Sequence, residues 1–186
     1  MSDIFGDPTM PLIDASASTL VVIDLQARLT PAIDGAEAMI ANTRRLLDAA
    51  KLMDVPALFT EQNPRGLGPT VPELAQDAVD PVAKMSFGAF GVPGFVERLG
   101  NRGGVVIAGC ETHVCVLQTA LELLQAGWRV SVVADAVGSR RAESKAAGLA
   151  RMAAHGAEIV TVEMVLFEWL GTAEHPRFKE LAKLIR

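Results

Sequence analysis

The sequence predicts an α/β fold built on a doubly wound, parallel six-stranded sheet. Segments typical of strands and segments typical of helices alternate along the chain, which is the order of βαβ units. Two of the strand-like runs, Thr19–Ile23 (TLVVI) and Gly104–Gly109 (GVVIAG), carry no charge and suit strands buried on both faces. The helical segments between strands are long enough for crossover connections, so neighbouring strands are expected to run parallel.

Each expected strand is a short apolar run that precedes turn residues or a helical pattern. In chain order, the expected strands are Thr19–Ile23, Val55–Phe59, a weak Val79–Ala83, Gly104–Gly109, Arg129–Val133 and Glu158–Val160. The segment 60–71, after the second strand, holds two prolines and two glycines and is typical of turns.

Helices are expected where apolar residues recur at helical spacing, as Met39, Ile40, Leu46 and Leu47 do. The expected helices are Ala36–Met53, a short Gly91–Leu99, Thr112–Gln125, Arg141–His155 and Pro176–Leu184. Gly127 follows the third of these and suits a C-cap. No repeat or linker interrupts this order. Residues 1–186 are therefore expected to form one domain, with residues 1–18 as an N-terminal extension of uncertain order.

Composition argues against several classes of protein. The 17 Lys and Arg residues against 22 Asp and Glu give a net charge of −5, which does not suit binding to nucleic acid or to a membrane surface. Half of the residues are hydrophobic, so the chain can bury a sizeable core. No apolar run reaches about 18 residues, so no transmembrane helix is expected. The N-terminal residues lack the pattern of a signal peptide, which predicts a cytoplasmic protein.

The two cysteines, Cys110 and Cys115, exclude a disulfide scaffold, because such domains carry many more. A zinc site is not expected either, since His113 is the only histidine nearby in the sequence. The spacing C-x₄-C also differs from the C-x-x-C of thioredoxin-like redox sites.

Three reactive side chains follow three different expected strands, where ligands bind in sheets of this kind. Asp24 follows the first strand, Lys84 the third, and Cys115 lies in the first turn of the helix after the fourth. Each has a plainer interpretation: Asp24 as a helix cap, Lys84 as a solvated loop residue, Cys115 as a buried core thiol. Together they supply a base, a cation and a nucleophile, and the positive end of a helix is expected to lower the thiol pKa.

At these positions the sequence resembles the isochorismatase-like cysteine hydrolase superfamily, and within it the subgroup called isochorismatase domain-containing proteins. The segments that carry the resemblance are LVVIDLQ (20–26), TEQNPRGLGPTVPEL (60–74), VAKMSFGAF (82–90), VIAGCETHVCVLQTALELLQAGWRVSVVADAVGSR (106–140) and EMVLFEWLG (163–171). The resemblance spans about residues 19–172 and implies a single hydrolase domain, a three-layer α/β/α sandwich with strand order 3-2-1-4-5-6.

The resemblance also implies a triad of Asp24, Lys84 and Cys115 that hydrolyses a small-molecule amide or related C–N bond through a thioester. It implies a cis peptide between Cys110 and Glu111, and an oxyanion hole made by the backbone N–H groups of Glu111 and Cys115. The metal site of nicotinamidases includes histidines after the second strand, and residues 60–71 have none, so no metal and no other cofactor is expected. Glu111 replaces a small residue frequent in amidases; its carboxylate either repels anionic substrates or faces solvent.

Four further side chains are candidates for substrate binding: Gln26, Gln62, Phe87 and Phe90. Gln26 lies two residues past Asp24 and faces the same side if the strand continues, or it is an ordinary loop amide. Gln62 follows the second strand and offers hydrogen bonds. Phe87 and Phe90 flank Gly88 and form either an apolar wall or, for at least one of them, part of the core.

The sequence thus predicts a cysteine hydrolase with a small-molecule substrate, and a catalytically silent scaffold or interaction protein of the same fold is the alternative. A redox module using both cysteines is a weaker rival. The apolar segment Met164–Leu170 is either core or subunit interface, and together with the resemblance it favours a homo-oligomer.

Overall fold

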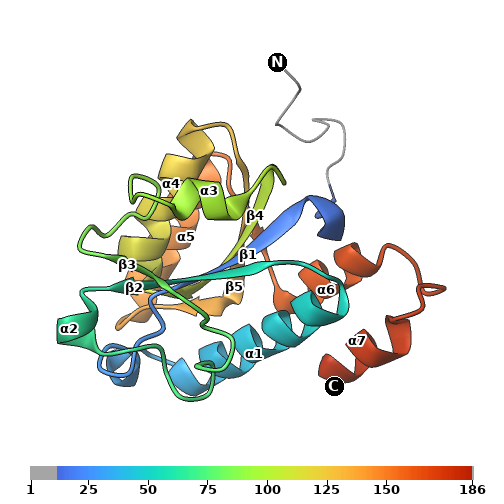
Figure 1. Cartoon of the computed structure of the whole chain (residues 1–186), viewed down its shortest axis with the longest axis horizontal. Coiled ribbons are helices and arrows are strands. Elements are labelled where there is room, and N and C mark those ends of the chain that lie inside the picture. Colours follow the sequence, from blue (N-terminus) through green and yellow to red (C-terminus); the bar gives the residue numbers. More distant parts are fainter. Residues whose placement is uncertain (1–11, 186) are drawn as a thin grey trace.

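The computed structural model describes residues 12–185 and confirms the predicted fold class. Its six-stranded sheet is parallel throughout, in the order β3-β2-β1-β4-β5-β6, with helices on both faces (Figure 1). The strands are β1 (Ser18–Ile23), β2 (Ala57–Gln62), β3 (Val82–Lys84), β4 (Gly104–Cys110), β5 (Arg129–Gly138) and β6 (Glu158–Val160). The helices are α1 (Ala36–Leu52), α2 (Pro64–Leu67), α3 (Phe95–Leu99), α4 (Leu117–Gln125), α5 (Ala142–Ala154), α6 (Val162–Leu170) and α7 (Phe178–Leu184).

Two hydrophobic clusters fill the space on either side of the sheet. Because side chains alternate along a strand, Leu20 and Val22 of β1 pack on the side of α1, α6 and α7, whereas Val21 and Ile23 pack on the side of α3, α4 and α5. All six residues of β1 are buried, as its uncharged sequence predicts for a central strand.

Strand order reverses between β1 and β4, which places a crevice at their carboxyl ends. Here Gly109 adopts a φ of +119° and pairs with Ile23. A Cβ atom at position 109 would overlap the backbone of Ile23. Only glycine therefore lets β4 approach β1 this closely at the end that carries Asp24 and Cys110.

Several element boundaries differ from the sequence predictions. β3 begins at Val82 rather than at position 79, because Asp80 has a φ of +48° and Val79 lies in an exposed loop. β5 continues to Gly138, past a shift of register between Ile107 and Gly109 of its neighbour. The expected helix from position 112 begins as a π-helical turn, Thr112–Val116, before α4.

The apolar segment Met164–Leu170 lies within α6, whose buried side includes Val165, Leu166 and Trp169. The segment is thus largely core, although Met164 and Phe167 keep exposed side chains. No helix within residues 12–185 is both long and apolar enough to cross a membrane.

Part of the predicted N-terminal extension, residues 1–11, lies outside the described residues. Residues 12–18 pack on the rest of the chain. Ile13 is buried and its backbone N–H donates to the Glu168 carboxylate at 2.7 Å, and Ala15–Ala17 form a 3-10 helix before β1.

Candidate active site

Asp24, Lys84 and Cys115, which lie far apart in the sequence, meet at the carboxyl end of the sheet. Lys84 Nζ lies 2.6 Å from Asp24 Oδ2, and neither side chain has any solvent exposure. The Asp24 carboxylate also lies close enough to the Cys115 thiol to raise the pKa of that thiol. A buried ion pair therefore lies beside a buried thiol. Because an unpaired buried charge is costly, the carboxylate and the ammonium group each have to compensate the charge of the other.

The chain turns sharply at Asp24, which adopts a left-handed φ of +48°. One carboxylate oxygen accepts a hydrogen bond from Lys84, and the other accepts one from the hydroxyl of Thr60 at 2.6 Å. Non-glycine residues in this region of φ are uncommon and concentrate at functional sites. The sequence predictions did not include Thr60, although a hydroxyl directly after the apolar residues 57–59 was the available signal. The structure places Thr60 in register with Ile23, next to Asp24.

Lys84 uses all three of its ammonium protons within the site. Besides Asp24, its Nζ donates to the carbonyl oxygens of Ser86 at 3.2 Å and of Phe87 at 2.8 Å. An ammonium group has three donors. Lys84 therefore holds the loop after β3 against Asp24 and has no proton free for a direct hydrogen bond to the thiol.

The pKa of the Cys115 thiol is raised to about 12, first by burial and then by the negative charge of Asp24. The positive charge of Lys84 and the backbone N–H of Glu111 lower this pKa and offset only part of the rise. The expectation that the start of a helix would lower the thiol pKa is thus wrong for this site. Burial penalises the thiolate more than the nearby cation favours it.

The peptide bond between Cys110 and Glu111 is cis, as the resemblance implies. The backbone N–H of Glu111 lies close enough to the Cys115 sulfur to lower the pKa of the thiol. The Glu111 side chain is buried and accepts hydrogen bonds from the backbone N–H of Arg140 at 2.9 Å and from its Nε at 3.0 Å. Burial opposes the charged form, but these contacts outweigh it and hold the pKa of Glu111 below its usual value. Glu111 thus faces Arg140 rather than solvent.

Gln26 does not have the role expected of it. Its side chain is buried, its Nε2 donates to the carbonyl oxygens of Gln62 at 3.0 Å and Gly68 at 2.7 Å, and its Oε1 accepts from the Gln62 N–H at 2.8 Å. Both amide protons are used by backbone. Gln26 therefore braces the loop after β2 instead of offering its amide to a substrate.

The other candidate side chains divide between the site and the core. Gln62 is half-buried, and its side-chain amide donates to the Met85 carbonyl at 3.1 Å, within the loop that Lys84 holds. The Phe87 side chain is about half exposed in the same loop. Phe90 instead packs on the core between α3 and α4, in the hollow it shares with Val96 and Trp128, which is the core alternative weighed for it.

Two neighbours of the thiol have partners of their own. Cys110 is fully buried and its sulfur donates to the backbone oxygen of Asp24 at 3.4 Å. His113 Nδ1 lies 3.0 Å from Ser139 Oγ. Cys110 and Cys115 are both free thiols.

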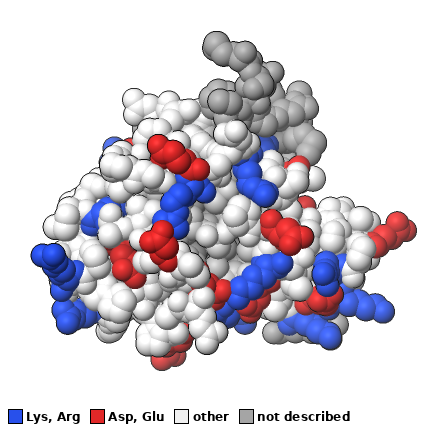
Figure 2. Space-filling model, viewed as in Figure 1, with Lys and Arg blue, Asp and Glu red and all other residues white. Residues whose placement is uncertain are grey.

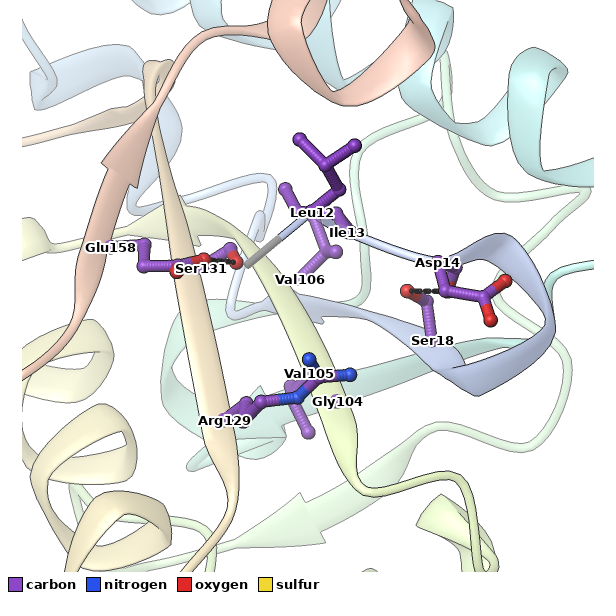
Figure 3. Close-up of a pocket in the computed structure, with 10 residues that line it drawn as sticks. All are labelled: Leu12, Ile13, Asp14, Ser18, Gly104, Val105, Val106, Arg129, Ser131 and Glu158. Carbon is purple, nitrogen blue, oxygen red and sulfur yellow. Dashed lines mark hydrogen bonds between the residues drawn. The ribbon is translucent and has the colours of Figure 1, made fainter. Parts of the chain in front are cut away.

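One hollow is lined by Lys84 together with Ala83, Met85 and residues 63–65, whereas other hollows lie away from Asp24, Lys84 and Cys115. Figure 3 shows one at the opposite end of the sheet, where Ser18, Gly104 and Arg129 begin β1, β4 and β5. Its volume of about 20 Å³ holds no more than about one water. Among residues 12–185 no three His, Cys, Asp or Glu side chains gather as a metal site would require.

The architecture and this site define the chain as a member of the isochorismatase domain family, whose model matches residues 18–164. Among its relatives is the mouse isochorismatase domain-containing protein 2A, which is 41% identical over 173 residues, 91% of this chain and 83% of the mouse protein.

Solved structures give the same picture. The MAR1 ribonuclease of Caenorhabditis elegans is 38% identical, with a TM-score of 0.88 over 94% of this chain and 92% of that one. The YcaC protein of Escherichia coli, described as an octameric hydrolase of unknown specificity, is 27% identical, with a TM-score of 0.88 over 96% and 91% of the two chains. YcaC of Pseudomonas aeruginosa, solved with covalent acrylamide, is 27% identical, with a TM-score of 0.80 over 96% and 98%.

Proposed function

We propose that this protein is a cysteine hydrolase that cleaves a small-molecule amide or a related C–N bond through a thioester on Cys115. The observation that carries the proposal is the proximity of the buried Cys115 thiol to a carboxylate that is itself fixed by hydrogen bonds from Lys84 and Thr60. A nucleophile beside a base, with the base oriented by further groups, is the general signature of covalent catalysis.

In the first half-reaction Asp24 removes the proton of the Cys115 thiol as sulfur attacks the carbonyl carbon. Because the thiol pKa is about 12, the thiol is protonated in the free protein and its proton leaves during attack rather than before it. The carbonyl electron pair moves to oxygen, which the backbone N–H groups of Glu111 and Cys115 receive as an oxyanion hole. Asp24 then protonates the nitrogen, the C–N bond breaks and ammonia or an amine leaves.

In the second half-reaction a water molecule replaces the departed amine. The Asp24 carboxylate takes one proton from the water as its oxygen attacks the thioester carbon. The C–S bond breaks, sulfur leaves with the electron pair, and Asp24 returns the proton to Cys115. Lys84, whose Nζ lies 2.6 Å from Asp24 Oδ2, compensates the carboxylate charge each time it reappears.

A small substrate fits the burial of this nucleophile. Cys115 is only 6% exposed, so the scissile bond has to reach a recessed sulfur. On the face shown in Figure 2, acidic and basic side chains are interspersed and form no continuous basic surface. Although the Caenorhabditis elegans relative is described as a ribonuclease, the net charge of −5 favours a small molecule over RNA here.

We also infer that the chain assembles as a homo-oligomer, as the Escherichia coli relative does in forming an octamer. Leu12 and, on α6, Met164 and Phe167 leave large apolar side chains exposed around one cleft. Apolar patches of this kind favour contact between subunits. A non-catalytic scaffold of the same fold is the alternative, and it gives no reason for a buried thiol, carboxylate and ammonium to stay in contact.

A panel of small amides, carbamoyl compounds and a short RNA tests the proposal, with ammonia, amine and nucleotide release measured for each. The parent protein is expected to hydrolyse at least one amide or carbamoyl compound. The Cys115→Ala variant is expected to keep the circular dichroism spectrum and to lose turnover. Unchanged turnover in Cys115→Ala, or cleavage of RNA alone, would overturn the proposal.

A further inference from the structure

We propose that Arg140 and Ser139, at the end of β5, are positioning residues for this reaction. They tie down the turn that presents the Cys115 sulfur and the Glu111 N–H, although neither touches the reacting atoms in the structure. The inference rests on the function proposed above, and it adds two residues from the segment between β5 and α5 to the site.

The first tie joins Arg140 to Glu111. The backbone N–H of Arg140 and its Nε both donate to the Glu111 carboxylate, at 2.9 Å and at 3.0–3.1 Å. The carboxylate is buried, while the Arg140 side chain is more than half exposed. Several hydrogen bonds from Arg140 hold the carboxylate on one side. Rotation of residue 111 about its own backbone would therefore break these charge-assisted hydrogen bonds.

The second contact joins Ser139 to His113, which is two residues closer to Cys115 in the sequence than Glu111 is. Ser139 Oγ lies 3.0 Å from His113 Nδ1. Helix α5 begins three residues later and packs on the same turn. A Cβ atom at Gly148 would lie 3.0 Å from the Cα of His113 and 3.1 Å from the carbonyl oxygen of Thr112. The π-helical turn is thus held from the same side by two hydrogen-bonding contacts, Arg140 with Glu111 and Ser139 with His113, and by the close backbone approach of Gly148.

These ties bear on catalysis through the N–H of Glu111. That N–H contacts the Cys115 sulfur, and the Glu111 carboxylate on the same residue is held by Arg140. Donors of an oxyanion hole act only when aimed at the oxygen that acquires charge. Loss of the hydrogen bonds between Arg140 and Glu111 would therefore weaken the stabilisation of an oxyanion more than it would lower the nucleophilic reactivity of the sulfur.

Two alkylating probes separate these effects. In the addition of acrylamide, the Cys115 sulfur bonds to the terminal alkene carbon, the thiol proton passes to Asp24, and the alkene electrons move onto the carbonyl oxygen as an enolate. Asp24 then returns the proton to the α-carbon. In alkylation by iodoacetamide, sulfur displaces iodide, the proton is lost, and no charge develops on the carbonyl oxygen. Acrylamide therefore needs the N–H donors and iodoacetamide does not.

The experiment measures both second-order rate constants at Cys115, with peptide mapping to exclude Cys110. Arg140→Gln is expected to lower the acrylamide rate about tenfold or more, as expected when a donor is misaimed, and to leave the iodoacetamide rate within about twofold. Ser139→Ala is expected to act in the same direction and more weakly. Arg140→Lys keeps the charge and is expected to recover part of the loss.

Arg141→Gln serves as the matched control, because Arg141 is exposed and its Glu143 contact is 4.0 Å long. It is expected to leave both rates unchanged, and thermal unfolding of every variant checks the fold. Equal losses with both probes, or an unchanged acrylamide rate in Arg140→Gln, would overturn the positioning role while leaving the proposed function in place. A parent protein whose Cys115 reacts with neither probe would overturn both.

Discussion

Replacing Lys84 with Met tests whether the buried ion pair holds the site together. The change keeps an unbranched side chain that is one heavy atom shorter and removes the ammonium group. Lys84 and Asp24 have no solvent exposure, so the carboxylate would be left buried without its cation. Removing one partner of a buried pair costs about 3–5 kcal/mol, against about 0–1 kcal/mol for an exposed pair. We therefore expect the free energy of unfolding at pH 7 to fall by about 3–5 kcal/mol.

Urea denaturation with matched variants measures this loss. Lys51→Met is the control, because Lys51 is mostly exposed and its partner Asp77 keeps Arg44 when Lys51 is removed. Its expected cost is about 1 kcal/mol or less. The double variant Lys84→Met/Asp24→Asn is expected to recover part of the stability but no hydrolysis. A loss in Lys84→Met no larger than that in Lys51→Met would refute the reasoning from burial.

Three further predictions concern the Cys115 thiol, the Thr60 hydroxyl and the exposed apolar side chains of α6. The Cys115 pKa is raised from 9.0 to about 12 in the folded protein, so its contribution to stability is complete below pH 9 and is lost towards pH 12. Denaturation from pH 8 to pH 10 should show the parent losing about 1 kcal/mol more than Cys115→Ala, and equal slopes would contradict this. Thr60→Val removes a buried hydrogen bond to the Asp24 carboxylate, so it should lower the free energy of unfolding by about 1.5–3 kcal/mol and should also lower kcat. A loss of stability with an unchanged kcat would contradict a role of Thr60 in catalysis. Light scattering should give a mass above that of one chain, and Phe167→Glu should reduce it; a monomeric parent would refute the assembly.

The sheet was predictable because its central strands are unambiguous in the sequence. Uncharged β-branched runs at positions 19–23 and 104–109 leave little choice but strands covered on both faces. The ends of elements were less predictable, since they depend on contacts between distant segments. β5 runs on to Gly138 beside β4, and α6 is apolar on most sides, so its helical period is masked.

Only those site residues that follow strand ends and match the family resemblance could be predicted from the sequence. Strand ends and the resemblance single out Asp24, Lys84 and Cys115, which the structure brings into contact. Hydrogen-bond partners that are distant in the sequence could not be predicted, because no local sequence pattern indicates them. Arg140 meets Glu111 across 29 residues, and the Gln26 amide is taken by backbone 36 and 42 residues away. The thiol pKa follows from burial, which the sequence does not display.

Trapping of an acyl group on Cys115 would reveal the proposed thioester itself. The parent protein would be mixed with an amide that it hydrolyses, quenched in acid within the first turnover, digested and analysed by mass spectrometry. We expect an acyl adduct on the Cys115 peptide that hydroxylamine removes, with none on the Cys110 sulfur and none in Cys115→Ala. Turnover by the parent without acylation of Cys115, or an adduct on another residue, would contradict the proposed thioester.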